Sequence, residues 1–542
     1  MLLNYGVLAQ LVIAVHGMSI PFVDSYFKSS QSVLAGSIQS TLDDIASISQ
    51  KQQHVDISKL PPLDSEELQS LINPEDLEYH ANVLYNLSKT SIDEFGNPTR
   101  VIGSSGHFAT INHILSVFNK YHWYYDITVQ PFTTVISKIE SAKLYLNNEE
   151  PANYAGLDLT PPTKNNGEFV NGTLVYIKNQ GCEDADYEDL VAAYEKDSSV
   201  DYVALIERGV CSFGDKSRKA GKYNAQAAIV FDNEDTDDIL HGTLGEPQGG
   251  EVPSISIVRS LAKHYIDNFL SQGKTVDVSV AIDSYVKSVV TKNVIAETRF
   301  GDKNNIVMAG AHTDSVTAGP GINDDGTGTI SLLVLAEQLT KYRPTNAIRL
   351  GFWAAEEEGL IGSTYYVEQL TAEENARHRL FLDYDMMASP NYAYQVYDGN
   401  NIDNPAGSQE IKDLYIDWYV SQGLNYTLIP FDGRSDYAAF IENNIPGGGI
   451  ATGAEGIKTP EEVAMFGGEA GEWYDHCYHQ LCDDLTNVDY EAWEFNTKLI
   501  AHSVATYGFS LDGFPAKKAA SEINTQSKET PQFKYRGGNL IF

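Results

Sequence analysis

The strongest constraint on the fold is an alternation of largely apolar runs and amphipathic segments that begins near residue 290 of this 542-residue chain. Residues 304–311 and 347–355 are runs of the kind found in buried strands, whereas 329–340 and 408–423 place apolar residues at helical spacing. Strands that are apolar throughout and separated by helices indicate a mostly parallel sheet with both faces covered. The sequence therefore predicts an α/β fold, with a mostly parallel mixed sheet flanked by helices.

The rest of the chain changes character several times. Residues 140–285 contain short β-rich runs separated by Gly, Asn and Asp turns, which indicates a separate β-rich domain. We expect five segments: a signal peptide (1–20), a removable pro-segment (21–64), the α/β domain (65–139 and 286–513), the β-rich domain (140–285) and a polar, loosely ordered C-terminal tail (514–542). The alternative to a pro-segment is a simple N-terminal helix of the mature protein.

The start of the chain indicates the secretory pathway. The apolar run 7–15 is too short to span a bilayer and is typical of a signal peptide, although no Lys or Arg precedes it. Four cysteines and three glycosylation sequons, at Asn86, Asn171 and Asn425, fit an oxidising compartment. We expect no transmembrane segment, and a location in the vacuole lumen or outside the cell. An N-terminal helix of a cytosolic protein is the alternative.

The charge balance limits the partners. The chain has 74 Asp and Glu residues against 37 Lys and Arg residues, a formal net charge of −37. Such a charge argues against nucleic acid or an anionic membrane as a partner. The oligomeric state stays open.

Candidate ligands follow three successive predicted strands. His312 comes after the first strand, Glu356 and Glu357 after the second, and Asp385 at the end of the third. Because the carboxyl ends of strands in an α/β sheet collect functional residues, we expect these side chains to lie together, joined by His479 from a later loop. A lone histidine is often structural and an acidic run is often a solvated surface, but four successive coincidences favour a site.

This set of side chains suits two divalent cations. Zinc binds His nitrogen and carboxylate oxygen, and two ions close together need a bridging carboxylate. Asp324, in a glycine-rich stretch, is suited to bridge, although its NDDG sequence is also a good turn. The remaining ligands would divide into His312 and Asp385 for one ion, and Glu357 and His479 for the other.

Neighbouring residues have expected supporting roles. Glu356 is not needed as a ligand, so it could take a proton from water and pass it to the leaving amine. Asp314 is placed to hold the free N–H of the first histidine. Cys477 and Cys482 could be metal ligands, but in an oxidising compartment a disulfide that fixes the loop of the second histidine is the preferred interpretation.

Four stretches resemble the motifs of the co-catalytic zinc aminopeptidases: HTDSVTAGPGINDDGTGT, AAEEEGLIGS, LDYDMMASPN and CYHQLCD. Residues 181–233 resemble the protease-associated (PA) domain inserted in those enzymes. The resemblance spans most of the chain from about 65 to 510. It implies the zinc exopeptidase fold, peptide substrates, and two Zn²⁺ ions as cofactors, with Co²⁺ as an exchangeable substitute.

The resemblance also assigns roles residue by residue. Tyr478 matches the residue that steadies the tetrahedral intermediate. The peptide bond between Asp324 and Asp325 is expected to be cis, and Glu358 stands where the family often has an apolar residue. The two zinc ligand sets are His312, Asp324 and Asp385, and Asp324, Glu357 and His479, with Glu356 as general acid and base.

A second disulfide is also implied by the resemblance. Cys182 and Cys211 match a cysteine pair that is bonded in such PA domains. Two free buried thiols are the alternative.

Together these features predict a metallo-aminopeptidase that hydrolyses N-terminal residues with a two-zinc site that activates water. The free amine would bind near Glu356 and Asp385, with help from the loop at Gly433 and Arg434. A zinc carboxypeptidase or dipeptidase on the same fold is an alternative, and a carboxypeptidase would need arginines that face the site, for which Arg434 is the obvious candidate. A non-enzymatic receptor-like binding protein is a second alternative, although such relatives lose ligands that this chain retains.

Overall fold

The computed structural model describes residues 57–236, 239–517, 533, 535–537 and 539–541. The predicted signal peptide and the predicted pro-segment as far as residue 56 lie outside the described residues. Within the described ranges, none of the helices combines the length and apolar character that a bilayer span requires.

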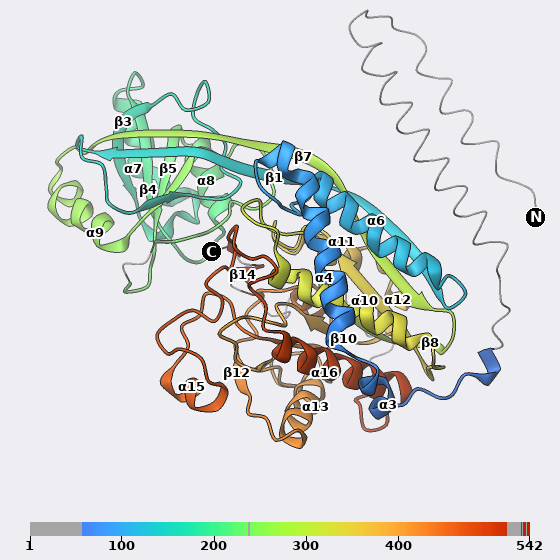
Figure 1. Cartoon of the computed structure of the whole chain (residues 1–542). Helices are drawn as coiled ribbons and strands as arrows, with labels where there is room; N and C mark the ends of the chain where they lie inside the picture. Colours follow the sequence, from blue (N-terminus) through green and yellow to red (C-terminus); the bar gives the residue numbers. More distant parts are fainter. Residues whose placement is uncertain (1–56, 237–238, 518–532, 534, 538, 542) are drawn as a thin grey trace, which may run out of the picture. The chain divides into compact units, whose positions relative to one another are not determined.

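Thirteen strands form one mixed sheet, with the order β12-β11-β13-β10-β8-β9-β7-β3-β4-β5-β6-β2 and with β1 beside β7. Figure 1 shows β1 and β7 side by side. Strand β8 pairs in parallel with β9 and β10, β10 pairs in parallel with β13, and β7 runs antiparallel to β9. The predicted α/β fold with a mostly parallel mixed sheet is confirmed. The strands are β1 (Tyr125–Leu146), β2 (Tyr154–Gly156), β3 (Val170–Ile177), β4 (Asp201–Glu207), β5 (Ala225–Phe231), β6 (Ser254–Ile257), β7 (Asp277–Thr298), β8 (Asp302–His312), β9 (Asn346–Trp353), β10 (His378–Tyr384), β11 (Gln395–Tyr397), β12 (Thr427–Ile429) and β13 (Gly447–Ala451).

Helices follow from local sequence signals. Helix α10 is apolar on nearly every side and is accordingly buried along almost its whole length. Helix α15 begins with a capping box in which Thr459 and Glu462 each accept the other's backbone N–H. The helices are α3 (Ser65–Ser70), α4 (Pro74–Ser88), α5 (Ile92–Phe95), α6 (Ser105–Lys120), α7 (Glu188–Lys196), α8 (Phe213–Lys222), α9 (Arg259–Asn268), α10 (Thr327–Leu339), α11 (Ile361–Glu368), α12 (Ala372–Arg377), α13 (Ser408–Ser421), α14 (Tyr437–Glu442), α15 (Pro460–Phe466) and α16 (Tyr490–Phe509).

Apolar cores cover both faces of the larger part of the sheet. Phe352 belongs to the core that contains Trp493 of α16, whereas its neighbour Trp353 belongs to the core that contains Phe440 of α14. Successive side chains of a strand point to opposite faces, so adjacent residues of β9 enter different cores. On the second face, the rings of Phe381 and Phe440 stack with their centroids 3.6 Å apart.

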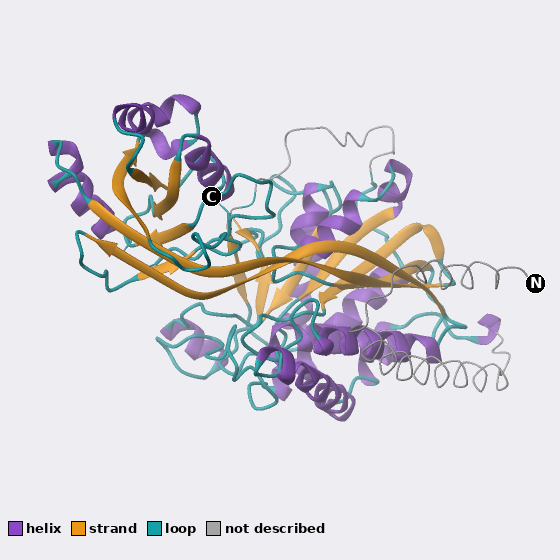
Figure 2. Ribbon diagram, turned by 90° about the horizontal axis from the view of Figure 1, so that it is seen from above, coloured by secondary structure: helices purple, strands orange, loops and turns teal. Residues whose placement is uncertain are grey.

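Strands β3 to β6 and helices α7 to α9 form a smaller β-rich part. Its four strands pair in parallel and enclose their own apolar core. The strands were predicted, but the helices between them were not, because segments such as α8 (FGDKSRKAGK) contain few apolar residues. Figure 2 shows β1 and β7 as long strands that run from the larger part of the sheet to the smaller one, and they pair from Tyr125–Thr298 to Leu146–Val278.

Most of the predicted loosely ordered tail, residues 518–532, 534, 538 and 542, lies outside the described residues, but the described end of the chain forms two short paired strands. Strand β14 (Tyr535–Arg536) pairs with β15 (Asn539–Leu540). Phe533 and Leu540 are buried, so isolated apolar residues anchor an otherwise polar segment. The average composition of the tail did not indicate these buried residues, because they are few among many polar ones.

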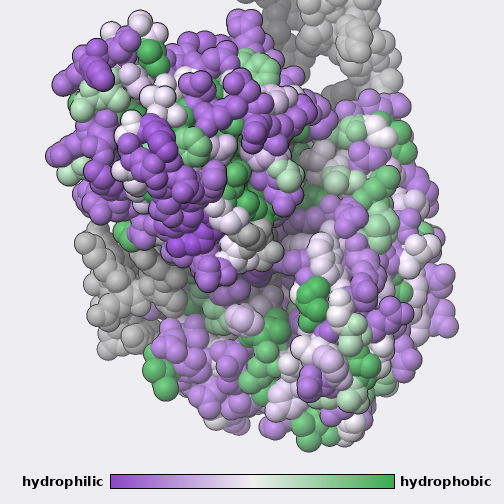
Figure 3. Space-filling model, turned by 90° about the vertical axis from the view of Figure 1, so that its left-hand side faces the viewer, coloured by the Kyte–Doolittle hydropathy of each residue, from purple (hydrophilic) through white to green (hydrophobic). Residues whose placement is uncertain are grey.

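The surface is predominantly polar. On the face drawn in Figure 3, hydrophilic residues predominate and apolar residues are scattered among them, as expected for a chain with a net charge of −37. The three predicted glycosylation sites, Asn86, Asn171 and Asn425, are all exposed.

Candidate active site

Parallel strands deliver the candidate residues to one edge of the sheet. Strand β8 ends at His312, whose register partner is the last residue of β9. Glu356 lies just beyond β9, and Asp385 directly follows β10. Because β9 and β10 flank β8, their carboxyl ends bring these three side chains together. The loop Ile322–Gly326, which precedes α10, adds Asp324.

Asp324 lies between two histidines. Its Oδ1 atom is 3.2 Å from Nε2 of His312, and its Oδ2 atom is 3.2 Å from Nε2 of His479. The peptide bond between Asp324 and Asp325 is cis, as the resemblance implied. One carboxylate oxygen directed at each histidine is the arrangement that a bridging ligand requires.

Further carboxylates complete two groups of donor atoms. Asp385 Oδ1 lies 3.7 Å from His312 Nε2, and Glu357 Oε2 lies 3.0 Å from His479 Nε2. All five predicted ligands therefore converge on one region. The possible ligand atoms lie within 4.8 Å of one another in each of two groups, Asp324, Glu357 and His479, and His312, Asp325 and Asp385.

The carboxylate of Asp325 accepts hydrogen bonds from backbone N–H groups. Its Oδ2 accepts a hydrogen bond from the N–H of His312 (3.0 Å), and its Oδ1 accepts from the N–H groups of Gly328 (2.9 Å) and Met386 (3.2 Å). These three bonds tie the loop to β8 and to the residues after β10. Asp325 therefore shapes the loop, whereas the carboxylate of Asp324 faces the two histidines.

Several buried atoms in this region have no hydrogen-bond partner among the described residues. They include both ring nitrogens of His312 and Oδ1 of Asp385. A buried polar atom without a partner costs about 1–3 kcal/mol. A divalent cation would bind the lone pair of one ring nitrogen of His312 and an oxygen of Asp385, and a set of imidazole nitrogens and carboxylate oxygens suits zinc. The donor set therefore fits a metal ion.

Glu356 is buried beside the donor atoms but belongs to neither group. Burial raises the pKa of its carboxyl well above the usual value, the positive His312 opposes this, and the carboxylates of Glu357 and Asp385 raise the pKa further. Burial alone would also raise the pKa of Asp324, but its contacts with the two histidines hold that pKa below the usual value. The two carboxyl groups therefore differ: one retains a proton readily and the other is ionised.

Asp314 supports the site in a different way from the one predicted. Its Oδ1 is 3.7 Å from Nδ1 of His312, which is too long for a hydrogen bond. Its two oxygens instead accept the backbone N–H groups of Glu356 and Glu357, both at 3.3 Å. The carboxylate therefore holds the turn after β9 in place.

Sequence reasoning missed Asp483 and Arg100. Asp483 accepts the N–H groups of Asn323 (2.8 Å) and Asp324 (3.0 Å), which fixes the loop of the bridging residue. Arg100 is fully buried and donates to the carbonyl oxygens of Thr313 (3.1 Å), Asp314 (3.0 Å), Pro320 and Gly321. For Asp483 the only sequence signal was that it is the last residue of the CYHQLCD motif, and for Arg100 there was none.

A disulfide closes the loop that carries Tyr478 and His479. Cys477 is bonded to Cys482, and the rings of Tyr478 and His479 stack with centroids 3.8 Å apart. Both predicted disulfides are present, including the one between Cys182 and Cys211. The alternatives of free thiols and of cysteine metal ligands are therefore wrong.

The donor groups face a cavity of 410 Å³. Arg434 lines this cavity and donates to Glu455 Oε1 at 2.8 Å, whereas Gly433 is buried beside it and does not line it. Its lining includes Glu356, Asp385, Tyr478 and His479 together with the apolar residues Met386, Ile429, Pro430 and Ile457.

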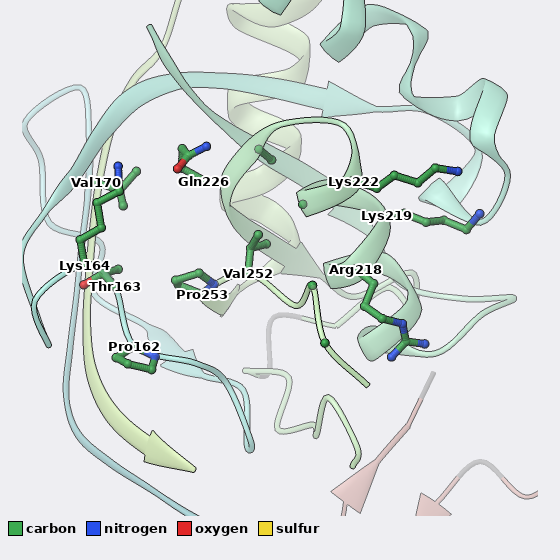
Figure 4. Close-up of a pocket in the computed structure, with 14 residues that line it drawn as sticks. Pro162, Thr163, Lys164, Val170, Arg218, Lys219, Lys222, Gln226, Val252 and Pro253 are labelled. Carbon is green, nitrogen blue, oxygen red and sulfur yellow. The ribbon is translucent and has the colours of Figure 1, made fainter. Parts of the chain in front are cut away.

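A second cavity, of 660 Å³, lies in the β-rich part and contains Lys164, Arg218, Lys219 and Lys222 (Figure 4). In Figure 4 the side chains of Lys219 and Lys222 extend away from Gln226. Both lysines contact Asp184, and Arg218 contacts Asp215 and Glu251. Most of this positive charge is therefore already neutralised, and the lining carries no donor group comparable to the first site.

Comparison with known proteins identifies relatives of both parts of the chain. Residues 293–504 match the model of peptidase family M28, and residues 170–264 match the PA domain. Aminopeptidase Y of Saccharomyces cerevisiae is 48% identical over 495 residues, which cover 90% of this chain and 89% of that protein. A probable leucine aminopeptidase 2 of Aspergillus oryzae is 42% identical over 81% of this chain and 86% of its own length.

The solved structures with a similar fold also include aminopeptidases. An aminopeptidase from Aneurinibacillus sp. strain AM-1 superposes with a TM-score of 0.66 at 25% identity, covering 82% of this chain and 96% of that one. A zinc aminopeptidase from Bacillus subtilis shares the fold with a TM-score of 0.53 at 20% identity, covering 84% and 98%.

Proposed function

The chain belongs to peptidase family M28 and is an aminopeptidase with a PA domain, and from this premise we propose that it removes N-terminal residues from peptides at a site that holds two zinc ions. One observation carries the proposal: the two oxygens of Asp324 each lie 3.2 Å from a different histidine nitrogen. A terminal ligand would need only one such contact.

Each ion would have three protein ligands. Asp324 would be shared, as the separate directions of its oxygens support. The donor chemistry suits zinc, and the Bacillus subtilis relative of the same fold is named a zinc aminopeptidase. When bound, the ions would supply Lewis acidity, which makes water more acidic and polarises the peptide carbonyl. We also propose that Co²⁺ exchanges for Zn²⁺, since both accept this donor set. The proposed ligands are His312, Asp324 and Asp385 for one ion, and Asp324, Glu357 and His479 for the other.

Glu356 would move the proton. It lines the cavity, is 3% exposed and has a raised pKa, so its carboxylate can take a proton from water and give it to the leaving amine. Tyr478 lines the same cavity and would donate its O–H to the oxygen of the tetrahedral intermediate. Carboxylates such as Asp385 would attract the positive N-terminus of the substrate.

Arg434 favours an aminopeptidase over a carboxypeptidase. Its guanidinium already pairs with Glu455 at 2.8 Å, so it is not a free cation for a substrate carboxylate. A peptide with a free N-terminus should be hydrolysed, and the same peptide with an acetylated N-terminus should resist. Faster cleavage of the acetylated peptide would exclude the proposal.

The role of Glu356 can be tested against its neighbour. Glu356→Gln should lower kcat by about 10²- to 10⁴-fold. Glu358→Gln is a matched control, because burial and the nearby Asp314 carboxylate raise the pKa of Glu358 well above the usual value, so that the neutral amide changes little. Metal analysis should find two zinc ions per chain in both variants, and full activity of Glu356→Gln would refute the assignment.

We also propose a location and a domain division. Two disulfides and three exposed sequons support passage through the secretory pathway, to the vacuole lumen or the exterior, with glycans on Asn86, Asn171 and Asn425. The proposed peptidase domain comprises 65–139 and 286–513, and the proposed PA domain comprises 140–285. Glycosidase treatment of protein from the native host should lower its apparent mass.

A further inference from the structure

The end of the chain folds back to the active site. We refer to its described residues, 533, 535–537 and 539–541, as the C-terminal strap. Its two short strands pair with each other. Its neighbours include residues of the peptidase domain and residues of the PA domain.

One side of the strap is anchored in the peptidase domain. Nη2 of Arg536 donates to both carboxylate oxygens of Glu442 on α14, at 2.8 and 2.6 Å. Phe533 is buried against Phe431 and Tyr437. A bidentate ion pair and a buried ring together fix this side of the strap.

The other side is anchored in the PA domain. Leu540 is 6% exposed and packs in an apolar cluster with Phe213 and Leu244. Its carbonyl oxygen accepts the N–H of Thr243 at 3.1 Å, and that of Ile541 accepts the N–H of Phe213 at 3.1 Å. The strap therefore connects two domains that are also joined by β1 and β7.

Between these anchors the strap touches two residues of the active site. A Cβ atom added to Gly537 would lie 3.0 Å from the carbonyl oxygen and 3.1 Å from Oε1 of Glu356. Gly537 has a φ of +61°, which glycine adopts without strain. The ring of Tyr535 lies under the guanidinium of Arg434, 4.1 Å from its Cζ atom.

The strap supports the cavity and does not block it. Glu356 and Arg434 both line the cavity, but none of the described strap residues does. Gly433 is covered by the strap, because a Cβ there would meet Phe533 Cβ at 2.4 Å. The strap therefore lies behind the functional side chains and leaves the substrate space open.

We propose that the C-terminal strap is a positioning element of the active site, which holds the Glu356 carboxyl through Gly537 and the Arg434 guanidinium through Tyr535. The proposal rests on the proposed function of Glu356. It makes the last residues of the chain necessary for turnover, although they are distant in sequence from every predicted ligand.

Gly537→Ala tests the contact with Glu356. The added methyl group would lie 3.1 Å from Oε1 of Glu356, so the carboxyl must shift by a few tenths of an ångström. Because misplacement by about 1 Å costs roughly 10²-fold in rate, this shift should cost less. We expect a loss of kcat of less than about 10²-fold, with little change in KM. Gly513→Ala is the matched control, since its φ is +82° but nothing lies within 4 Å of the added Cβ.

Tyr535 tests the second contact. Arg434 lines the substrate cavity, and a ring under its guanidinium contributes about 0.5–2 kcal/mol, so Tyr535→Ala should raise KM about 2- to 30-fold. Tyr535→Phe retains the ring and should restore most of the affinity. Metal content and thermal unfolding, measured for every variant, show whether the site and the fold are intact.

The outcomes separate this proposal from the proposed function. If Gly537→Ala and Gly513→Ala behave alike, and Tyr535→Ala retains the wild-type KM, the strap has no positioning role even though Glu356→Gln is inactive. If Gly537→Ala does not fold, the KM values of Tyr535→Ala and Tyr535→Phe decide whether the strap has a positioning role. An equal rise of KM in Tyr535→Ala and Tyr535→Phe overturns the role of the ring.

Discussion

Asp483 gives a stringent test of how the bridging loop is held. Its carboxylate is 2% exposed and accepts the backbone N–H groups of Asn323 and Asp324, one on each oxygen, at 2.8 and 3.0 Å. Asp483→Ala leaves both N–H groups buried without an acceptor. At about 1–3 kcal/mol for each unsatisfied group, the free energy of unfolding should fall by about 2–6 kcal/mol. That is a large fraction of the roughly 5–15 kcal/mol that a folded domain typically has.

The measurement is urea unfolding with and without a chelator. Asp483→Asn retains one acceptor oxygen, so it should lose about half as much, roughly 1–3 kcal/mol. Asp484→Ala is the matched control, because this adjacent acid accepts only from Thr486 at the exposed surface. A loss below about 1 kcal/mol in Asp483→Ala, or an equal loss in Asp484→Ala, would refute the reasoning.

Three further predictions concern stability. Burial lowers the pKa of His107 to about 4, below its unfolded value of about 6.5. The free energy of unfolding should therefore be highest above pH 6.5 and fall by up to about 3 kcal/mol as the pH drops towards 4. His107→Gln should flatten this pH dependence in urea titrations, and an unchanged slope would contradict the prediction. Replacing both cysteines of a disulfide by serine should lower the free energy of unfolding by about 3.5 kcal/mol for Cys182–Cys211, separated by 29 residues, and by about 2 kcal/mol for Cys477–Cys482, separated by 5. A larger loss of thermal stability for the second pair would be inconsistent with an effect of chain entropy. Arg100→Lys should lower the free energy of unfolding by about 1.5–3 kcal/mol, since the three N–H donors of an ammonium group cannot replace the four carbonyl contacts of the guanidinium. An unchanged urea midpoint would show that these guanidinium contacts are not needed for stability.

The convergence of the candidate site was predictable because its signals are local. His312, Glu356 and Asp385 each follow an apolar run, and the parallel order of those runs determines where their ends meet. The pairing of Cys477 with Cys482 was predictable for the same reason, since the two residues are close in sequence. For these residues, the sequence pattern already indicated which side chains lie together, and the structure supplies the distances between them.

Contacts between distant segments could not be predicted. Arg100 binds carbonyl groups more than 200 residues further along the chain, and backbone carbonyls have no side-chain identity to recognise. The strap was missed because a few apolar anchors, such as Leu540, do not alter the polar average of the tail. The role of Asp314 differed because a spacing of two residues does not specify which N–H groups the carboxylate accepts.

The extent of β1 was also hidden. Residues 123–132 alternate in the manner of a strand, whereas β1 continues to Leu146. From Ser137 to Lys143 none of the strand residues is buried and several are polar, such as Lys138, so the alternation is lost while backbone pairing with β7 continues.

The β1–β7 ladder has a consequence for how this protein could have been assembled. Leu146 faces Val278, and the PA-domain match at 170–264 lies between these two residues in the sequence, so the chain leaves towards that domain and returns from it at adjacent points. Backbones of antiparallel partners are about 5 Å apart, a gap that a two-residue turn can close. A complete peptidase could therefore have gained the PA domain by lengthening a single hairpin, without a change of register in any strand that carries a ligand.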